Sequence, residues 1–146
     1  MRRMAAACVM LLMAVAVFAG KKPETIDELK ARAAQAKPQD QVKLFMEVAQ
    51  RQLDSAGRSY DAGDSDKAKA EIEDVSAYAE KAGDAAMQTG KRVKRTEIDV
   101  RKLAQRMEAL RRSLSVDDRP PLEAAGERLE KLDSRLLDHM FKGKKK

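Results

Sequence analysis

The sequence is poor in the residues from which large cores and catalytic metal sites are usually built. It has no tryptophan, aromatic residues make up only 3% of its 146 residues, and it contains one cysteine and one histidine. Any core must therefore consist mainly of leucine, valine, isoleucine, methionine and alanine. That composition favours helices packed against helices over a sheet, and the length suits a single domain.

The single cysteine lies in an N-terminal segment with the features of a secretory signal peptide. Arg2 and Arg3 form a short positive region, residues 5–19 are an uncharged apolar run, and Ala19 places a small residue at the cleavage position. We therefore expect residues 1–19 to be removed during export by general secretion. The mature chain is then periplasmic or secreted.

The alternative to cleavage is that the leader stays as a membrane anchor. Fifteen apolar residues form only about 22 Å of helix, whereas the hydrocarbon core of a bilayer is about 30 Å thick. Cleavage is therefore favoured, and we expect no transmembrane span in the mature chain. Cys8 is lost with the leader, which excludes disulfides and thiolate metal sites afterwards.

The longest regular pattern is a stripe of uncharged residues, spaced alternately three and four apart, from Ile72 to Leu114. None of its thirteen positions is charged, although charged residues make up 37% of the chain. Such a stripe is typical of a helix that buries one face. We predict one long helix over residues 65–114. A break at Gly83 is the alternative, but the stripe keeps its phase through both Gly83 and Gly90.

Shorter helical patterns flank this stripe. After a polar lead-in at residues 20–24, helices are expected over residues 25–36, 39–60 and 119–140. Thr25 and Glu28 have the spacing of a capping box at the start of the first helix. The predicted fold is all-α: an elongated helical bundle with one long central helix and antiparallel coiled-coil-like hairpins, in a single domain over residues 25–140.

Charged residues are sorted into blocks. Residues 54–84 hold nine acids and four bases, residues 91–112 hold nine bases and three acids, and residues 117–138 hold seven acids and four bases. Because the connection is short and the charges are opposite, we expect the last helix to fold back along the basic segment. Aromatic residues are not interleaved with the basic block, so nucleic acid is not an expected partner.

The region around Gly63 carries a resemblance to a known family. The residues that carry it are Ala56, Tyr60, Gly63, Asp64, Lys67, Ala68, Ile72 and Val75. This stretch of about 25 residues, within residues 53–79, is similar to a single helix-turn-helix of the tetratricopeptide repeat family, whose stacked helix pairs bind other proteins. The resemblance implies a helical hairpin and a protein partner.

Motifs for catalysis or cofactor binding are missing from the sequence. It contains no glycine-rich phosphate loop, nucleophile elbow, metal-spaced histidine pair or calcium loop. His139 has no clustered partners, and we expect it only to interact favourably with the C-terminal end of the last helix. We therefore expect a protein that is not an enzyme and has no cofactor and no metal site.

Two binding functions remain as hypotheses. In the first, the protein is a non-enzymatic periplasmic scaffold or adaptor that binds an unknown protein partner or a second copy of itself. The expected contact surface is the part of the long stripe where the residues are small, because small side chains let a partner backbone approach closely. Its residues are Ala79, Ala82, Gly83, Ala86, Thr89 and Gly90.

In the second hypothesis, the basic tail at residues 141–146 binds an anionic surface of the cell envelope, either lipid or glycan. The formal net charge is +6, and removal of the two leader arginines reduces it to +4. Lys142, Lys144, Lys145 and Lys146 account for all of that remaining charge.

Overall fold

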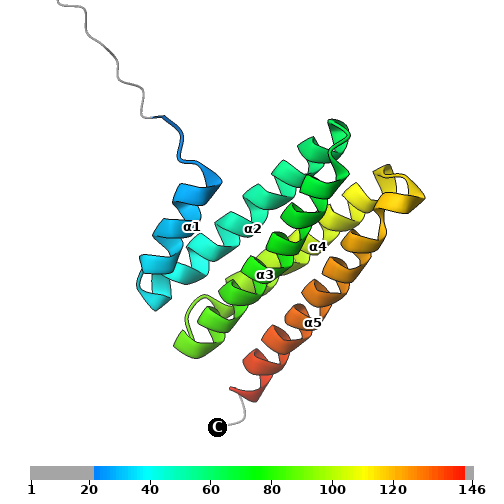
Figure 1. Cartoon of the computed structure of the whole chain (residues 1–146). Helices are drawn as coiled ribbons and strands as arrows, with labels where there is room; N and C mark the ends of the chain where they lie inside the picture. The colour runs from blue at the N-terminus through cyan, green and yellow to red at the C-terminus, as the bar shows by residue number, and fades with distance from the viewer. Residues whose placement is uncertain (1–21, 144–146) are drawn as a thin grey trace, which may run out of the picture.

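The computed structural model describes residues 22–143 (Figure 1). These residues form five α-helices and one short 3₁₀ helix: α1 (Ile26–Gln35), α2 (Pro38–Asp61), α3 (Ser65–Thr89), α4 (Val93–Ser113), η1 (Val116–Asp118) and α5 (Pro120–Lys142). The described part of the chain contains no strand, so the all-α prediction is confirmed. The predicted signal peptide at residues 1–19 and the lysines at 144–146 lie outside the described residues.

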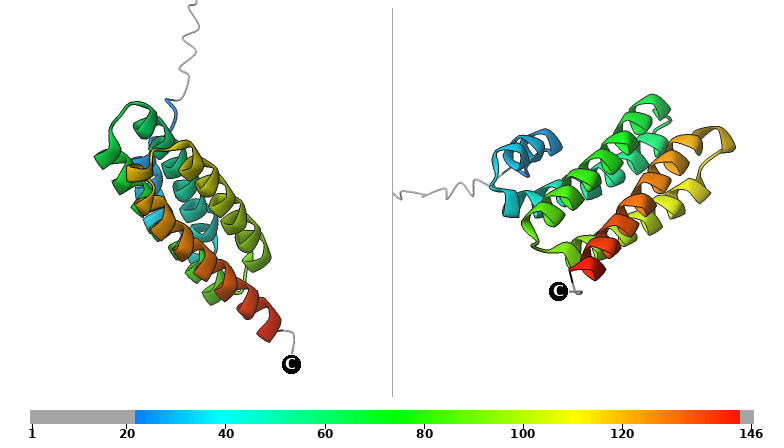
Figure 2. Two further views of the ribbon diagram at one scale, coloured as in Figure 1. Left: turned by 90° about the vertical axis from the view of Figure 1, so that its right-hand side faces the viewer. Right: turned by 90° about the horizontal axis from the view of Figure 1, so that it is seen from below.

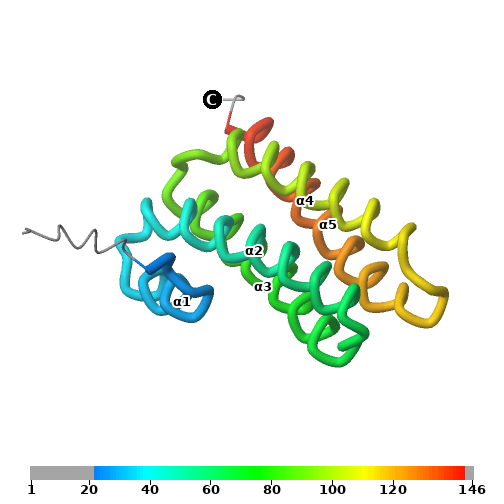
Figure 3. The backbone as a smooth tube through the Cα atoms, turned by 90° about the horizontal axis from the view of Figure 1, so that it is seen from above, coloured from blue at the N-terminus to red at the C-terminus, as the bar shows by residue number. Residues whose placement is uncertain are grey.

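Four long helices form the body of the molecule. α2 and α3 make one antiparallel hairpin, α4 and α5 make another, and α1 packs against α2 (Figures 1 and 2). α3 is central, because it packs closely against both α2 and α5, whereas α2 and α4 touch only lightly. Figure 3 shows the two hairpins as neighbouring pairs that are joined by the α3–α4 turn.

The prediction of one long helix over residues 65–114 is wrong. The chain turns between α3 and α4, where Gly90 has a φ of +66° and Arg92 has a φ of +62°. Two left-handed residues so close together end one helix and redirect the chain into the next. The stripe keeps its phase across this turn because both helices face the same core. Gly83, the break considered as an alternative, lies inside α3.

Two apolar clusters hold the helices together. The larger one runs through the four-helix body and includes Leu103, Met107 and Leu129. The smaller one joins α1 to α2. The α1 helix begins with the predicted capping box, in which Thr25 Oγ1 accepts from the Glu28 N–H and the Glu28 carboxylate accepts from the Thr25 N–H.

The α2–α3 hairpin turns at Gly63, as the sequence predicted. Gly63 has a φ of +79°, and the Asp64 side chain caps α3 by accepting from the Lys67 N–H at 3.2 Å. Deeper in the hairpin, the Glu71 carboxylate accepts hydrogen bonds from hydroxyls of α2 at 2.6 and 2.7 Å, donated by Ser55 and Ser59. The hairpin is thus confirmed, and its likeness to a tetratricopeptide repeat stays a prediction.

The α4–α5 hairpin is also confirmed, but the predicted charge pairing between its helices is mostly wrong. Arg111 with Glu123, at 3.1 Å, is the one ion pair between α4 and α5 in the described residues. The arginines of α5 pair instead with acids of α3, and Arg128 binds Glu80 at 2.7 Å. The apolar faces therefore decide which helices pack together, and the long charged side chains adjust to that packing.

The ion pairs make stability depend on acid pH. Hydrogen bonds from Arg111 and Arg112 lower the pKa of Glu108 from 4.5 to about 2, and the hydrogen bond from Arg128 lowers the pKa of Glu80. A carboxylate with a lower pKa in the folded state stabilises the protein above its unfolded pKa and loses that contribution as pH falls. For Glu108 this stabilising contribution is lost as pH falls from 4.5 to about 2.

We therefore expect the free energy of unfolding, measured by urea denaturation, to fall across that pH window. The double variant Glu80→Gln/Glu108→Gln should show a shallower fall than the wild type, because neither amide can gain a proton there. An equal slope in the two proteins would contradict a stabilising role for these carboxylates.

Candidate functional site

The small residues predicted to bind a partner lie inside the bundle. Ala79, Ala82 and Ala86 have 0% exposure, and Gly83 is also buried. A Cβ atom at Gly83 would lie 2.5 Å from Leu132 Cδ1 of α5. The prediction of an open partner surface here is therefore wrong. The chain reverses after α3, and α5 returns alongside it to cover this face.

The last two residues of that predicted surface form the turn instead. The Thr89 hydroxyl donates to the Ala85 carbonyl at 2.8 Å and accepts from the Lys91 N–H at 3.3 Å. Gly90 is exposed and supplies the left-handed conformation that ends α3. Both residues are therefore explained by the turn.

Basic residues gather at one end of the bundle. The α1–α2 connection, the α3–α4 turn and the end of α5 lie together there (Figures 1 and 3), and Lys91 Nζ donates to Gln39 Oε1 at 2.9 Å. We call this the basic end, and its basic residues are Lys37, Lys91, Arg92, Lys94, Arg95 and Lys142. All six are exposed. Of these six residues, only Arg95 forms an ion pair within residues 22–143, and its partner is Asp99 at 3.1 Å.

Acidic residues gather at the opposite end, where the α2–α3 turn lies near η1 (Figure 1). We call this the acidic end, and its acids are Asp61, Asp64, Asp66, Asp117 and Asp118. Burial raises the pKa of Tyr60, at the end of α2, and the charge of Asp118 in η1 raises it further. The same segments also carry five bases, Arg58, Lys67, Lys69, Arg112 and Arg119, so the excess of one charge lies at the basic end alone.

The predicted basic tail begins at the basic end. Lys142 is in the last turn of α5, next to Phe141, whose side chain is 62% exposed. Lys144, Lys145 and Lys146 lie outside the described residues. The part of the tail that is described thus joins the other basic residues at the same end of the molecule.

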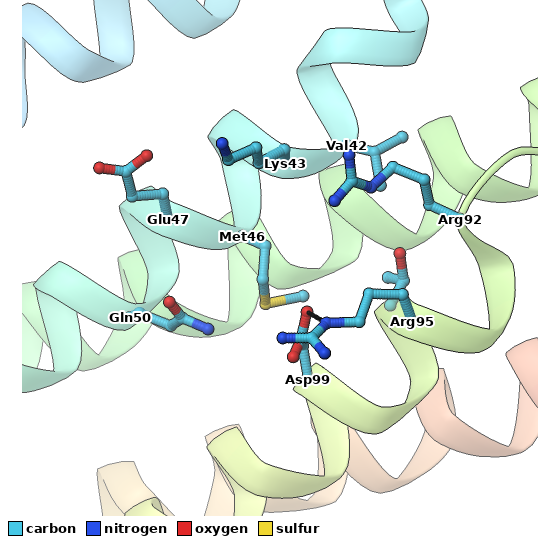
Figure 4. Close-up of a pocket in the computed structure, with 9 residues that line it drawn as sticks. Val42, Lys43, Met46, Glu47, Gln50, Arg92, Arg95 and Asp99 are labelled. Atoms are coloured by element: carbon cyan, nitrogen blue, oxygen red, sulfur yellow. Dashed lines mark hydrogen bonds and ion pairs between the residues drawn. The ribbon is translucent and has the colours of Figure 1, made fainter.

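A hollow of about 290 Å³ opens between α2 and α4 beside the basic end (Figure 4). Val42, Lys43, Met46, Glu47 and Gln50 of α2 line it, together with Arg92, Arg95, Thr96 and Asp99 from the start of α4. In Figure 4 the Arg92 side chain extends from the α3–α4 turn toward α2. Farther along the two helices, Arg106 of α4 forms an ion pair with Asp54 of α2.

The acids that line the hollow already have partners, whereas two of its bases do not. Glu47 pairs with Arg51 at 2.6 Å, and Asp99 pairs with Arg95. Lys43 and Arg92 form no ion pair with any residue from 22 to 143. Both also line a second, adjoining hollow, whose other residues are Arg32, Ala36, Asp40 and Leu44. These two bases are the candidates for holding an anion here, and in Figure 4 the Lys43 ammonium is turned along α2, away from Arg92.

Arg92 has an unusual backbone conformation. It is the one residue other than glycine with a positive φ in the described part of the chain. The left-handed region costs an ordinary residue about 1–2 kcal/mol, and such strain is often retained where the side chain has a function. Arg92 belongs to the basic segment at residues 91–112, along which the last helix was expected to lay its acids, but it forms no ion pair within residues 22–143.

Three further observations concern His139, metal binding and membrane spans. His139 is exposed in the last turn of α5. The described residues include no group of three or more histidine, cysteine, aspartate or glutamate side chains that could hold a metal ion. Among the described helices, none is long and apolar enough to cross a membrane.

Comparison with known proteins found no matching family model, no matching curated protein and no matching solved structure. The function must therefore be inferred from the geometry of this chain.

Proposed function

We propose that the protein is a non-enzymatic helical scaffold of the cell envelope that attaches to an anionic membrane surface through its basic end. The observation that carries the proposal is the set of exposed basic residues contributed by three separate segments, five of which have no ion pair within residues 22–143. Near an anionic leaflet, each lysine or arginine contributes about 1 kcal/mol to binding. The leader-like residues 1–19 support a location in the envelope.

Phe141 favours lipid over glycan as the anionic surface. Its ring is 62% exposed and adjoins Lys142, at the start of the lysine-rich tail. An aromatic ring beside lysines suits the headgroup region of a membrane, where the ring enters the interface and the ammonium groups remain among the phosphates.

We expect the chain from Gly20 to Lys146 to co-sediment at low salt with vesicles that contain phosphatidylglycerol, and not with phosphatidylcholine vesicles. The variant Lys91→Glu/Lys94→Glu should bind at least about tenfold more weakly, because two favourable charges become two repulsive ones. High salt should release the wild type, because exposed charges are screened.

The matched control reverses two exposed bases near the acidic end, Arg58→Glu/Lys67→Glu, with the same change in net charge. It should retain binding close to that of the wild type. Equal losses in the two variants would mean that only net charge matters, and absence of binding to both vesicle types would refute the proposal. Circular dichroism should confirm that both variants are folded.

A protein adaptor is the second candidate, and the exposed bases of the basic end favour it. An acidic surface on another protein, or on a second copy of this chain, complements them. Light scattering of the vesicle-free samples separates this candidate from the first. A mass that rises with protein concentration at low salt supports self-association, and a constant monomer mass opposes it.

A further inference from the structure

We propose that the hollow between α2 and α4 binds a phosphate group, held by Arg92, Lys43 and the hydroxyl of Thr96. The inference goes beyond membrane attachment, because it needs neither the lysine tail nor a lipid surface. It names both the place, the hollow between α2 and α4, and the chemical group that binds there, a phosphate.

The start of α4 lacks the negative charge that a helix N-terminus favours. Arg92 is its N-cap residue and makes no side-chain capping bond, and the first turn contains no acid. Lys94 and Arg95 occupy that turn instead, next to the positive end of the helix dipole. An oxyanion at this point would offset both the dipole and the lysine and arginine charges.

Thr96 gives an independent indication of a bound acceptor. Its side chain lines the hollow and the residue is only 3% exposed, yet its hydroxyl has no hydrogen-bond partner within residues 22–143. The hydroxyls of Thr89 and Ser113, by contrast, donate to carbonyls of their own helices. In the described residues the fully buried side-chain atoms without a partner are Tyr60 Oη and Asp133 Oδ1, so the Thr96 oxygen, which is not one of them, is reached from the hollow. An occupant of the hollow that accepts a hydrogen bond would pair with this hydroxyl.

The backbone of Arg92 indicates that its side chain is needed. Glycine serves the left-handed position at residue 90, and it would serve equally at residue 92 without strain. An arginine at this position supplies a planar guanidinium, which binds phosphate through two parallel hydrogen bonds. Lys43 lines the same two hollows and adds a second charge without an ion pair.

The size and remaining charges of the hollow limit the ligand. A volume of about 290 Å³ is at the small end for organic ligands, so a phosphate with a small attached group fits best. Glu47 and Asp99 also line the hollow, but each is paired with an arginine. Asp40, in the adjoining hollow, would repel a second phosphate.

Titration of the chain from Gly20 to Lys146 with inorganic phosphate, at constant ionic strength, tests the inference. We expect saturable changes in the backbone amide NMR signals of Arg92, Arg95 and Thr96, and no such changes with sodium chloride. Absence of saturable shifts would overturn the proposal and leave the hollow as a water-filled gap.

Variants separate a specific site from general charge. Arg92→Gly should weaken phosphate binding at least about tenfold, while the urea midpoint of unfolding rises because backbone strain is relieved. Thr96→Val should also weaken binding and remain folded. Lys94→Ala is the matched control, since it removes one charge from the same turn without touching the hollow, and it should change affinity less than about twofold. Equal losses in Arg92→Gly and Lys94→Ala would overturn the proposal.

The phosphate could belong to a soluble compound or to a lipid headgroup, and vesicle binding distinguishes the two sources. If Arg92→Gly loses inorganic phosphate but still co-sediments with phosphatidylglycerol vesicles, the ligand is a soluble phosphate. If it loses both, the ligand is a headgroup. Failure of vesicle binding together with saturable phosphate binding refutes the membrane proposal and leaves this inference standing.

Discussion

Replacing Leu132 with alanine is expected to lower the free energy of unfolding by about 2–5 kcal/mol, the usual range for deleting a buried leucine side chain. Leu132 is 1% exposed, and its side chain lies against the backbone of Gly83. Its removal leaves a space between α3 and α5 that a backbone cannot fill. Since small domains are stable by only about 5–15 kcal/mol, the loss is a large part of the total.

Urea denaturation followed by circular dichroism measures this loss. Leu137→Ala is a suitable control, because Leu137 is on the same helix and is only partly buried. It should cost clearly less, since a partly exposed side chain transfers less apolar area from water. Similar losses in the two variants would mean that α5 does not pack on α3 through Leu132.

Replacing Gly83 with leucine is expected to lower the free energy of unfolding by about 1–3 kcal/mol through overpacking. Leucine favours a helix over glycine by about 1 kcal/mol, so helix propensity alone predicts that the free energy of unfolding would rise. The contact decides the outcome, because a Cβ atom would already lie 2.5 Å from Leu132 Cδ1 and 3.3 Å from its Cγ. The side chain of Leu132 is buried and has little room to move.

The matched control is Gly126→Leu. Gly126 is inside α5, and a Cβ atom there would meet nothing within 4 Å. This variant should be neutral or more stable by up to about 1 kcal/mol. In the double variant Gly83→Ala/Leu132→Ala the loss should be smaller than the sum of the two single losses, because the two residues touch. Equal stabilisation by leucine at both glycines would show that the Gly83 face is open to a partner.

Local signals in the sequence predicted most of the helix ends. The helices predicted over residues 25–36, 39–60 and 119–140 begin and end within two residues of α1, α2 and α5, and the Thr25–Glu28 capping box marked the start of α1. Such signals work because capping and turn residues bond to backbone groups only a few positions away. The whole signal therefore lies within a short stretch of the sequence.

The turn at Gly90 was missed for a physical reason. A long uncharged stripe indicates one buried face, but two successive helices that face the same core display the same stripe. The available clue was the glycine followed by Lys91, Arg92, Lys94 and Arg95. Read as the start of a helix, that run is an unfavourable concentration of positive charge, which itself points toward an anion.

The candidate site could not be located from the sequence, because its residues meet only after folding. Lys43 is on α2 and Arg92 is in the α3–α4 turn, and only the packing of the hairpins brings them to one hollow. The small residues of the stripe were expected to be open to contact with an external partner. The contacting helix, however, is α5 of the same chain. The close approach of Leu132 to Gly83 shows this contact, and the periodicity of the stripe does not identify which helix makes it.

The position of the basic end also has a geometric consequence. A protein that rests on a surface by its basic end stands with its helices upright, and α2, with 24 residues, is about 36 Å long at 1.5 Å per residue. The acidic end, with the 72% exposed side chain of Val116 beside it, would then be held at roughly that height. The molecule would act as a spacer, presenting a tip of mixed charge with one exposed apolar side chain to whatever lies above the surface.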